Sequence, residues 1–243
     1  MGLYSFVCRF SCTLCICLLH TFLTLPSTLY HSLYNLYMRR FHTHSYITLP
    51  DGSHDVIICI HGRNAHPADF NYFINKIKPH TDYQILSFYL GPTVNSSIYK
   101  DVDALYEQVL PLMDKINNII LIGLSKGGLI AVQYAIKHPT KIKKIITVSS
   151  PLNGTNMANY ILFNDTVKKE LSYESEFTQD VMKKSEHLPI YSIVPRFDSL
   201  IIPNHSAFFR HSFDKCYFYM GYYSHSGILY APEVINTIIA WIK

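Results

Sequence analysis

Charged residues are scarce in this sequence: Asp, Glu, Lys and Arg make up 16% of its 243 residues, while apolar residues make up 49%. The net charge is only +4, and the lysines are spread over several predicted helices and turns. Proteins that bind nucleic acid gather their basic residues in one stripe or patch. The composition therefore predicts one globular domain with a substantial core and argues against nucleic acid as a partner.

The sequence also lacks the common motifs of metal and nucleotide sites. Its 13 histidines form no HExxH motif and no histidine-rich tract, and no two CxxC motifs are paired at zinc-binding spacing. Neither G-x-x-x-x-G-K-[ST] nor G-x-G-x-x-G occurs, and these are the two glycine-rich motifs that bind nucleotide phosphates. We predict no metal and no organic cofactor.

Cysteine is rare outside the N-terminus. Four of the six cysteines lie within the first 17 residues, and only Cys59 and Cys216 follow. This distribution does not form a disulfide framework. Because both later cysteines lie in apolar runs, we expect them to be buried thiols that behave as small hydrophobic side chains.

No Asp, Glu, Lys or Arg occurs between residues 10 and 38. Arg9 precedes this stretch, Arg39 and Arg40 follow it, and its second half carries tyrosines at helical spacing. Such a segment is typical of a signal anchor, a signal peptide or an apolar helix packed on the domain. The first two interpretations predict a protein that is membrane-associated or secreted through residues 1–40.

From residue 41 to residue 243 strands and helices alternate. Short apolar runs predict strands at 45–49, 55–60, 83–90, 117–122, 144–150, 189–195 and 216–220. Amphipathic stretches predict helices at 68–77, 101–116, 126–137 and from 232 onward. A polar helical region over 151–188 interrupts the alternation and is expected to be a cap over the sheet. The fold class predicted is α/β, with a mostly parallel sheet covered by helices on both faces.

Ser125 stands in the pentapeptide GLSKG, between a predicted strand and a predicted helix. A nucleophilic serine at such a sharp turn points its oxygen outward, and larger side chains two residues away would collide with the turn. Gly123 and Gly127 fit this requirement. The alternative is a glycine-rich turn that binds phosphate, but the motifs of such turns are missing.

With this serine in its context, the chain resembles the α/β-hydrolase fold superfamily, closest to the lipases and esterases, over residues 46–243. The resemblance implies a catalytic triad in the order serine, acid, histidine. The acid is then Asp198, in the loop PRFDSLIIP after a strand, and the base is His225, in GYYSHSG before the last helix. The same resemblance covers VSSPLNGT (148–155), which is similar to a turn found in lipases.

Other assignments remain open for the acid and the base. Asp214 precedes the last predicted strand, and His205 and His211 lie in the connection before it. In the non-catalytic alternative, Asp198 only caps a turn and His225 is an ordinary surface histidine.

The resemblance also implies an oxyanion hole built from backbone N–H groups. The strand ending in His-Gly assigns one donor to Arg63, with Gly62 allowing close approach, and the other donor to Lys126 at the start of a helix. The side chains of Arg63 and Lys126 would either attract an anionic substrate or lie solvated at the surface.

These features together predict a serine hydrolase of carboxylic ester bonds, including lipid esters or thioesters, that works through an acyl-enzyme. The expected partner is a small-molecule or lipid ester. Two alternatives are an acyltransferase that uses the same triad and a non-catalytic, membrane-tethered binding protein built on the hydrolase fold.

Overall fold

The computed structural model describes residues 33, 49–91, 96–160 and 164–243. Its strands are β1 (His54–Ile60), β2 (Gln84–Ser87), β3 (Ile116–Leu124), β4 (Ile142–Val148), β5 (Ile190–Pro195) and β6 (Cys216–Tyr219). Its α-helices are α2 (Asn71–Ile77), α3 (Ile98–Val109), α4 (Lys126–Lys137), α5 (Asp165–Leu171), α6 (Glu176–Lys184) and α7 (Pro232–Ile242). Short 3-10 helices lie between several of them.

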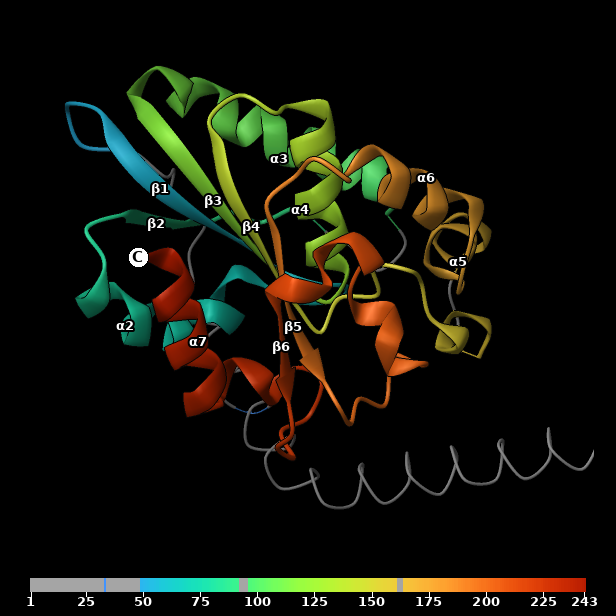
Figure 1. Ribbon diagram of the computed structural model, residues 1–243. Helices are drawn as coiled ribbons and strands as arrows, with labels where there is room; N and C mark the ends of the chain where they lie inside the picture. The colour runs from blue at the N-terminus through green and yellow to red at the C-terminus, as the bar shows by residue number, and fades with distance from the viewer. Residues whose placement is uncertain (1–32, 34–48, 92–95, 161–163) are drawn as a thin grey trace, which may run out of the picture.

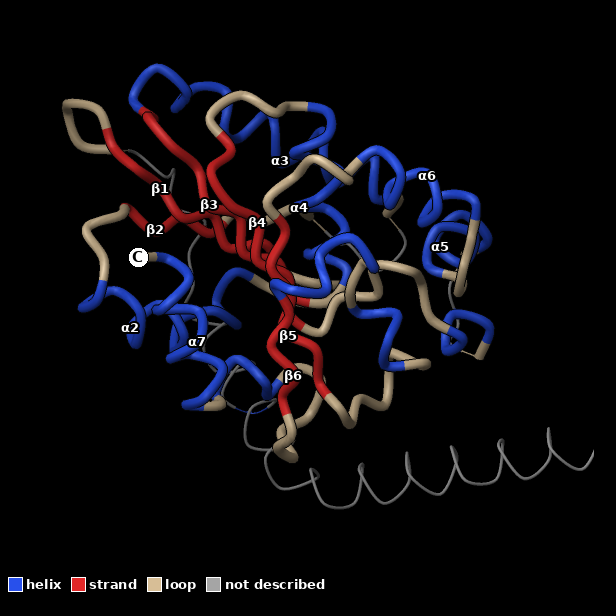
Figure 2. The backbone as a smooth tube through the Cα atoms, viewed as in Figure 1, coloured by secondary structure: helices blue, strands red, loops and turns tan. Residues whose placement is uncertain are grey.

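All six strands run parallel in one twisted sheet with the order β2-β1-β3-β4-β5-β6 (Figure 2). The central strands β1 and β3 are almost continuously apolar and buried, as expected where helices cover both faces of a parallel sheet. The predicted α/β class is therefore confirmed.

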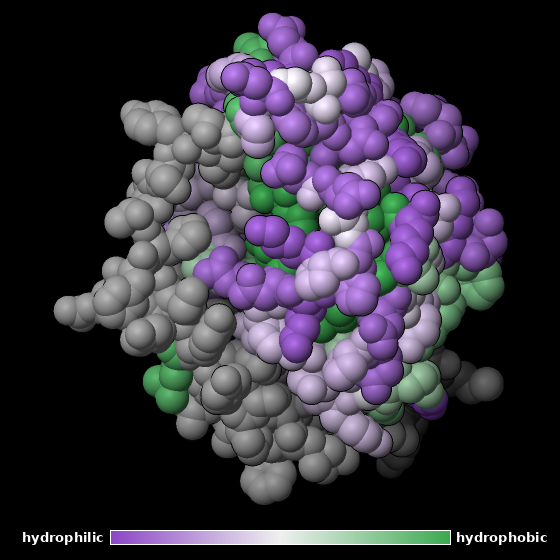
Figure 3. Space-filling view, turned by 90° about the vertical axis from the view of Figure 1, so that its left-hand side faces the viewer, coloured by the Kyte–Doolittle hydropathy of each residue, from purple (hydrophilic) through white to green (hydrophobic). Residues whose placement is uncertain are grey.

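Helices α3 and α4 cover one face of the sheet, and α2 and α7 cover the other (Figure 1). Along β1 the side chains alternate between these layers, because Ile58 and Ile60 pack with the α3/α4 layer while Ile57 and Cys59 pack with the α2/α7 layer. Outside this core, the face in Figure 3 is mostly hydrophilic, with hydrophobic side chains visible in the gaps.

Several element boundaries differ from the prediction. The predicted helix 101–116 begins at Ile98, because Ser97 accepts a hydrogen bond from the Lys100 N–H as an N-cap, and it changes to a 3-10 helix near Pro111. The predicted helix 68–77 likewise begins as a 3-10 helix at Pro67. The strand predicted at 83–90 is shorter, at Gln84–Ser87. The strand predicted at 45–49 lies outside the described residues except for Leu49.

Between β4 and β5 the chain forms α5 and α6, on the side of the sheet covered by α3 and α4 (Figure 1). A backbone bridge joins Thr155 to Ser172, and Gly154 leaves room for it, since a Cβ there would lie 2.0 Å from the Ser172 carbonyl oxygen. These helices fall within the region 151–188 that is predicted to be a cap, and that role stays a prediction.

The expected localisation needs correction. Within the part of the chain that the structure describes, no helix combines the length and hydropathy needed to cross a membrane. The segment 1–40, on which the expectation of membrane association or secretion rested, lies outside the described residues except for Leu33.

Candidate active site

Ser125 lies at the carboxyl end of β3, directly before the first residue of α4. Its backbone has φ 56° and ψ −127°, a conformation that an L-residue adopts only when its surroundings enforce it. Two backbone hydrogen bonds hold it there: the Ser125 N–H donates to Val148 O over 2.9 Å, and the Gly128 N–H donates to Ser125 O over 3.0 Å.

The glycines on either side allow this turn to pack closely. A Cβ on Gly123 would lie 2.3 Å from the Gly127 carbonyl oxygen, and one on Gly127 would lie 2.2 Å from the Ile60 carbonyl oxygen. Both contacts are with backbone atoms and could not be relieved by a side-chain rotation. Glycine is therefore needed at both positions for steric reasons.

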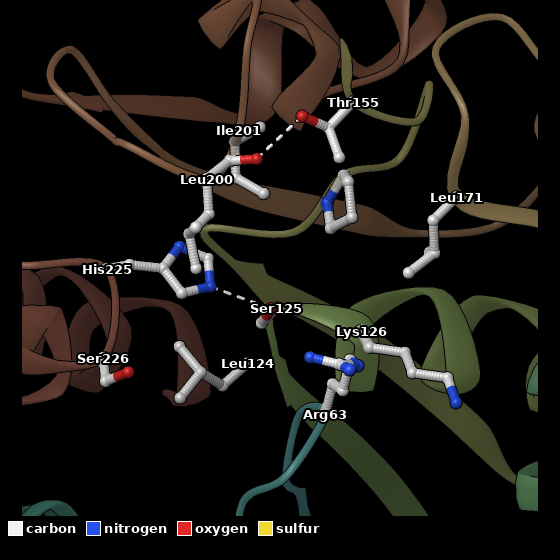
Figure 4. Close-up of a pocket in the computed structure, with 11 residues that line it drawn as sticks. Arg63, Leu124, Ser125, Lys126, Thr155, Leu171, Leu200, Ile201, His225 and Ser226 are labelled. Carbon is white, nitrogen blue, oxygen red and sulfur yellow. Dashed lines mark hydrogen bonds between the residues drawn. The ribbon is translucent and has the colours of Figure 1, made fainter. Parts of the chain in front are cut away.

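Ser125, His225 and Asp198 form a continuous row of hydrogen bonds. His225 Nε2 lies 2.8 Å from Ser125 Oγ (Figure 4), and His225 Nδ1 lies 2.7 Å from Asp198 Oδ2. His225 stands in the turn after β6, which is closed by a hydrogen bond from the Gly227 N–H to Ser224 Oγ. The geometry is that of a serine whose proton can pass to an imidazole oriented by a carboxylate.

The Asp198 carboxylate is completely enclosed by its partners. Its Oδ1 accepts hydrogen bonds from the N–H groups of Leu200 (2.8 Å) and Ile201 (3.1 Å), and its side chain has no exposed surface. Burial alone would raise the pKa of Asp198, but the interaction with His225 and these two N–H groups together lower the pKa below its ordinary value. Asp198 is thus favoured in its ionised form.

The competing candidates lie elsewhere. Asp214 is exposed two residues before β6, at the amino end of that strand. His205 is hydrogen-bonded to the Tyr173 hydroxyl at 3.0 Å, and His211 is exposed and stacks on Phe209. None of the three belongs to the row that contains Ser125.

The residues expected to donate the oxyanion N–H groups lie beside Ser125. A Cβ on Gly62 would be 3.0 Å from both Ser125 Cβ and the Leu124 carbonyl oxygen, so the loop after β1 packs directly against the serine. Arg63 is half-buried at the same cavity, and burial lowers the pKa of its guanidinium. Lys126 is the first residue of α4.

The position of the Lys126 side chain agrees neither with solvation at the surface nor with attraction of an anionic substrate. The side chain is neither solvated nor directed at a substrate, since its exposed fraction is 1% and its ammonium forms an ion pair with Asp101. The sequence could not reveal this, because the partner comes from a different helix.

A cavity of about 140 Å³ opens at Ser125. Apolar side chains from four separate segments form much of its wall: Leu124, Pro151, Leu171, Leu200 and Ile201 (Figure 4). In the described ranges, no three His, Cys, Asp or Glu side chains are arranged to hold a metal ion.

Residues 55–179, just over half of the chain, match the family model described as the alpha/beta hydrolase fold. The chain belongs to the α/β-hydrolase fold family. No curated protein matches it in a search by sequence.

Solved structures of several lipases are similar to this chain in fold. Lipase B from Aspergillus fumigatus aligns with a TM-score of 0.62 at 16% identity, over 78% of this chain and 54% of that one, so this chain spans about half of its length. Bacillus licheniformis lipase BlEst2 in its mature form aligns with a TM-score of 0.60 at 13% identity, over 82% of this chain and 96% of that one. Paleococcus ferrophilus monoacylglycerol lipase aligns with a TM-score of 0.58 at 17% identity, over 79% of this chain and 95% of that one. At these identities the likeness shows the fold alone.

Two features of this α/β-hydrolase site were missed from the sequence. One is Asp101, the partner of Lys126. The other is the Thr155 hydroxyl, which donates to Leu200 O at 2.7 Å (Figure 4). Thr155 lies in the lipase-like turn 148–155, which was the available signal, but its partner could be found only in the folded chain.

Proposed function

We propose that this protein is a serine hydrolase that cleaves carboxylic esters, with Ser125 as nucleophile, His225 as base and Asp198 as the acid that orients it. The observation that carries the proposal is the unbroken row of hydrogen bonds through these three side chains, with heavy-atom distances of 2.8 Å and 2.7 Å. The strained backbone of Ser125 between a strand and a helix supports the same conclusion.

In the first half of the reaction Ser125 Oγ attacks the carbonyl carbon of the ester while His225 Nε2 takes the hydroxyl proton. The imidazolium that forms is stabilised by the ionised Asp198, which also fixes the Nδ1–H tautomer of His225. The tetrahedral intermediate collapses, the bond to the alcohol oxygen breaks, and His225 returns the proton to the departing alcohol. An acyl-enzyme on Ser125 remains.

In the second half water attacks the acyl-enzyme. His225 accepts a proton from the water, a second tetrahedral intermediate forms, and the carboxylic acid leaves as Ser125 Oγ regains its proton. In both intermediates the negative oxygen is stabilised by the backbone N–H groups of Arg63 and Lys126. The first N–H groups of a helix have no partner within the helix, and the positive end of the helix dipole lies there. This chemistry needs no cofactor.

The proposed substrate is an ester with an apolar acyl group, lipid esters and thioesters included. The leucine, isoleucine and proline side chains around the cavity support this class. The structural neighbours named as lipases support it as well, although a fold alone does not define a substrate.

The full chain should hydrolyse 4-nitrophenyl esters, assayed from acetate to palmitate. Ser125→Ala should lower kcat by at least about 10⁴, because the proposed acyl-enzyme can no longer form, while Ser53→Ala, which changes an exposed serine before β1, should keep the wild-type rate. Equal activity of wild type and Ser125→Ala, or no activity of folded wild type on any chain length, would contradict the proposal.

A further inference from the structure

A buried ion pair lies immediately behind the nucleophile turn. Lys126 Nζ is 2.7 Å from Asp101 Oδ2, in the first turn of α3, and both side chains are only 1% exposed. The ammonium also donates a hydrogen bond to the carbonyl oxygen of Ser96 over 2.5 Å. Neither oxygen of Asp101 accepts an aligned hydrogen bond from any described residue. The positive charge of Lys126 is therefore the main compensation for this carboxylate.

Stability alone is a poor explanation for such a pair. Removing two charged groups from water costs more than their attraction commonly returns, and well-packed apolar residues are often as stable in the same place. A buried pair is more useful where a single geometry has to be enforced. The immediate neighbour of Lys126 is Ser125, whose backbone conformation needs enforcement.

A second buried carboxylate ties the pair to α5. Glu170 is 6% exposed, and its Oε2 accepts a hydrogen bond from the Ile98 N–H at the start of α3 over 2.8 Å. Burial and the like charge of Asp101 raise the pKa of Glu170, while the Ile98 N–H and the charge of Lys126 oppose this rise. The Glu170–Ile98 hydrogen bond joins α5, whose last residue lines the cavity, to the start of α3, and the Lys126–Asp101 pair joins α3 to the start of α4.

The Lys126 side chain extends away from Ser125, and its ammonium lies far along the wall from the serine oxygen (Figure 4). It therefore influences the serine through its own backbone. Fixing the far end of the side chain adds a restraint on the Lys126 backbone to the hydrogen bond that the Gly128 N–H donates, over 3.0 Å, to the carbonyl oxygen of the peptide group between Ser125 and Lys126. This peptide group carries the N–H that the proposed function assigns to the oxyanion.

We propose that Lys126 and Asp101 are positioning residues that hold the Lys126 N–H at the oxyanion. This inference rests on the proposed function, because it concerns the oxyanion donor of that reaction. It predicts that the pair contributes to the rate of the chemical step more than to the binding of the ester, since the oxyanion exists only after attack.

The test replaces both charges at once, so that neither is left buried without a partner. The double variant Lys126→Met with Asp101→Leu is compared with Lys137→Met with Asp103→Leu. The control pair joins the same two helices at 2.5 Å, but its side chains are 47% and 55% exposed. Kinetics with a 4-nitrophenyl ester and melting temperature are measured for both. Asp101→Asn, which keeps the size of the side chain, is measured beside them.

The expected result is a fall of kcat by about 10- to 100-fold in the buried-pair variant, somewhat less than the loss of a whole oxyanion donor. KM should change by less than about threefold, and the control variant should keep both constants. In Asp101→Asn, kcat should also fall, by a smaller factor than in the double variant. If the double variant does not fold, Asp101→Asn serves as the test, and its kcat should fall while its KM stays nearly unchanged.

A wild-type kcat in the folded buried-pair variant would overturn the inference. So would failure of both Asp101 variants to fold while the control is active, because the pair would then serve the fold alone. If wild type and control show no activity that depends on Ser125, the proposed function itself has failed, and the two failures are distinguishable.

Discussion

Both oxygens of the Asp198 carboxylate are hydrogen-bonded inside the protein. One oxygen faces His225 Nδ1, and the other accepts the N–H groups of Leu200 and Ile201. The second set fixes the carboxylate in the orientation that the first needs. This division of roles is what a residue requires if it is to orient an imidazole.

Asp198→Asn should lower kcat by about 10⁴, because the amide can stabilise the wrong tautomer of His225. Asp214→Asn is the matched control, since Asp214 is the other acid near the last strand and lies exposed at its amino end. Steady-state kinetics on one ester decide between them. A large loss in Asp214→Asn with little loss in Asp198→Asn would reverse the assignment of the acid.

At the residue scale, chain order was enough to select three side chains that lie together in the structure. Ser125, Asp198 and His225 could be selected because each follows a strand and they occur in the family's order, and the structure brings them together. The burial of Lys126 could not be predicted. A lysine at the start of a helix is usually solvated, and only the packing of α3 on α4 supplies Asp101.

At the scale of elements, the turn after β4 supports the loop after β5. The Thr155 hydroxyl donates a hydrogen bond to Leu200 O at 2.7 Å, and the Thr155 hydroxyl oxygen accepts the Ile202 N–H at 3.1 Å. Leu200 and Ile201 are the residues whose N–H groups hold Asp198. The two connections therefore act as one support for the carboxylate.

Thr155→Val keeps the shape of the side chain but removes these hydrogen bonds. We expect a loss of about 1–3 kcal/mol in the free energy of unfolding, since a partly buried acceptor and donor lose their partner. We also expect a fall in kcat of roughly tenfold, because the Asp198 loop loses part of its support. Thr155→Ser retains the hydroxyl and should recover most of the rate. Denaturant unfolding and ester kinetics measure the two effects. A wild-type kcat in Thr155→Val would show that the hydrogen bonds of Thr155 do not contribute to the role proposed for Asp198.

Element boundaries were predictable where a local signal marks them. Helix α4 spans the predicted residues 126–137, because the glycine turn marks its start. Helix α3 starts at Ile98, before the predicted residue 101, because Ser97 is its N-cap. Strand β2 was predicted too long because its apolar run continues into the loop, where Phe88 and Leu90 are buried without pairing.

At the scale of the whole molecule, one parallel sheet gathers the site. The carboxyl ends of its strands lie along one edge, so the connections after β1, β3, β4, β5 and β6 meet there although they are far apart in sequence (Figures 1 and 2). This convergence follows from the alternation of strands and helices, which the sequence displays clearly. The apolar N-terminal stretch is a different case, because its composition is compatible with a signal anchor, a signal peptide or a packed helix. The localisation expected from it was not upheld.

The most direct test of the central claim is to treat the full chain with a fluorophosphonate, which modifies activated serines, and to map the modified peptide by mass spectrometry. We predict a single adduct on Ser125, because in the described part of the chain only this serine is hydrogen-bonded to His225, at 2.8 Å. The adduct should form much more slowly in His225→Ala and not at all in Ser125→Ala. A folded wild-type protein that remains unmodified, or that is modified at another serine while Ser125 stays intact, would contradict this claim.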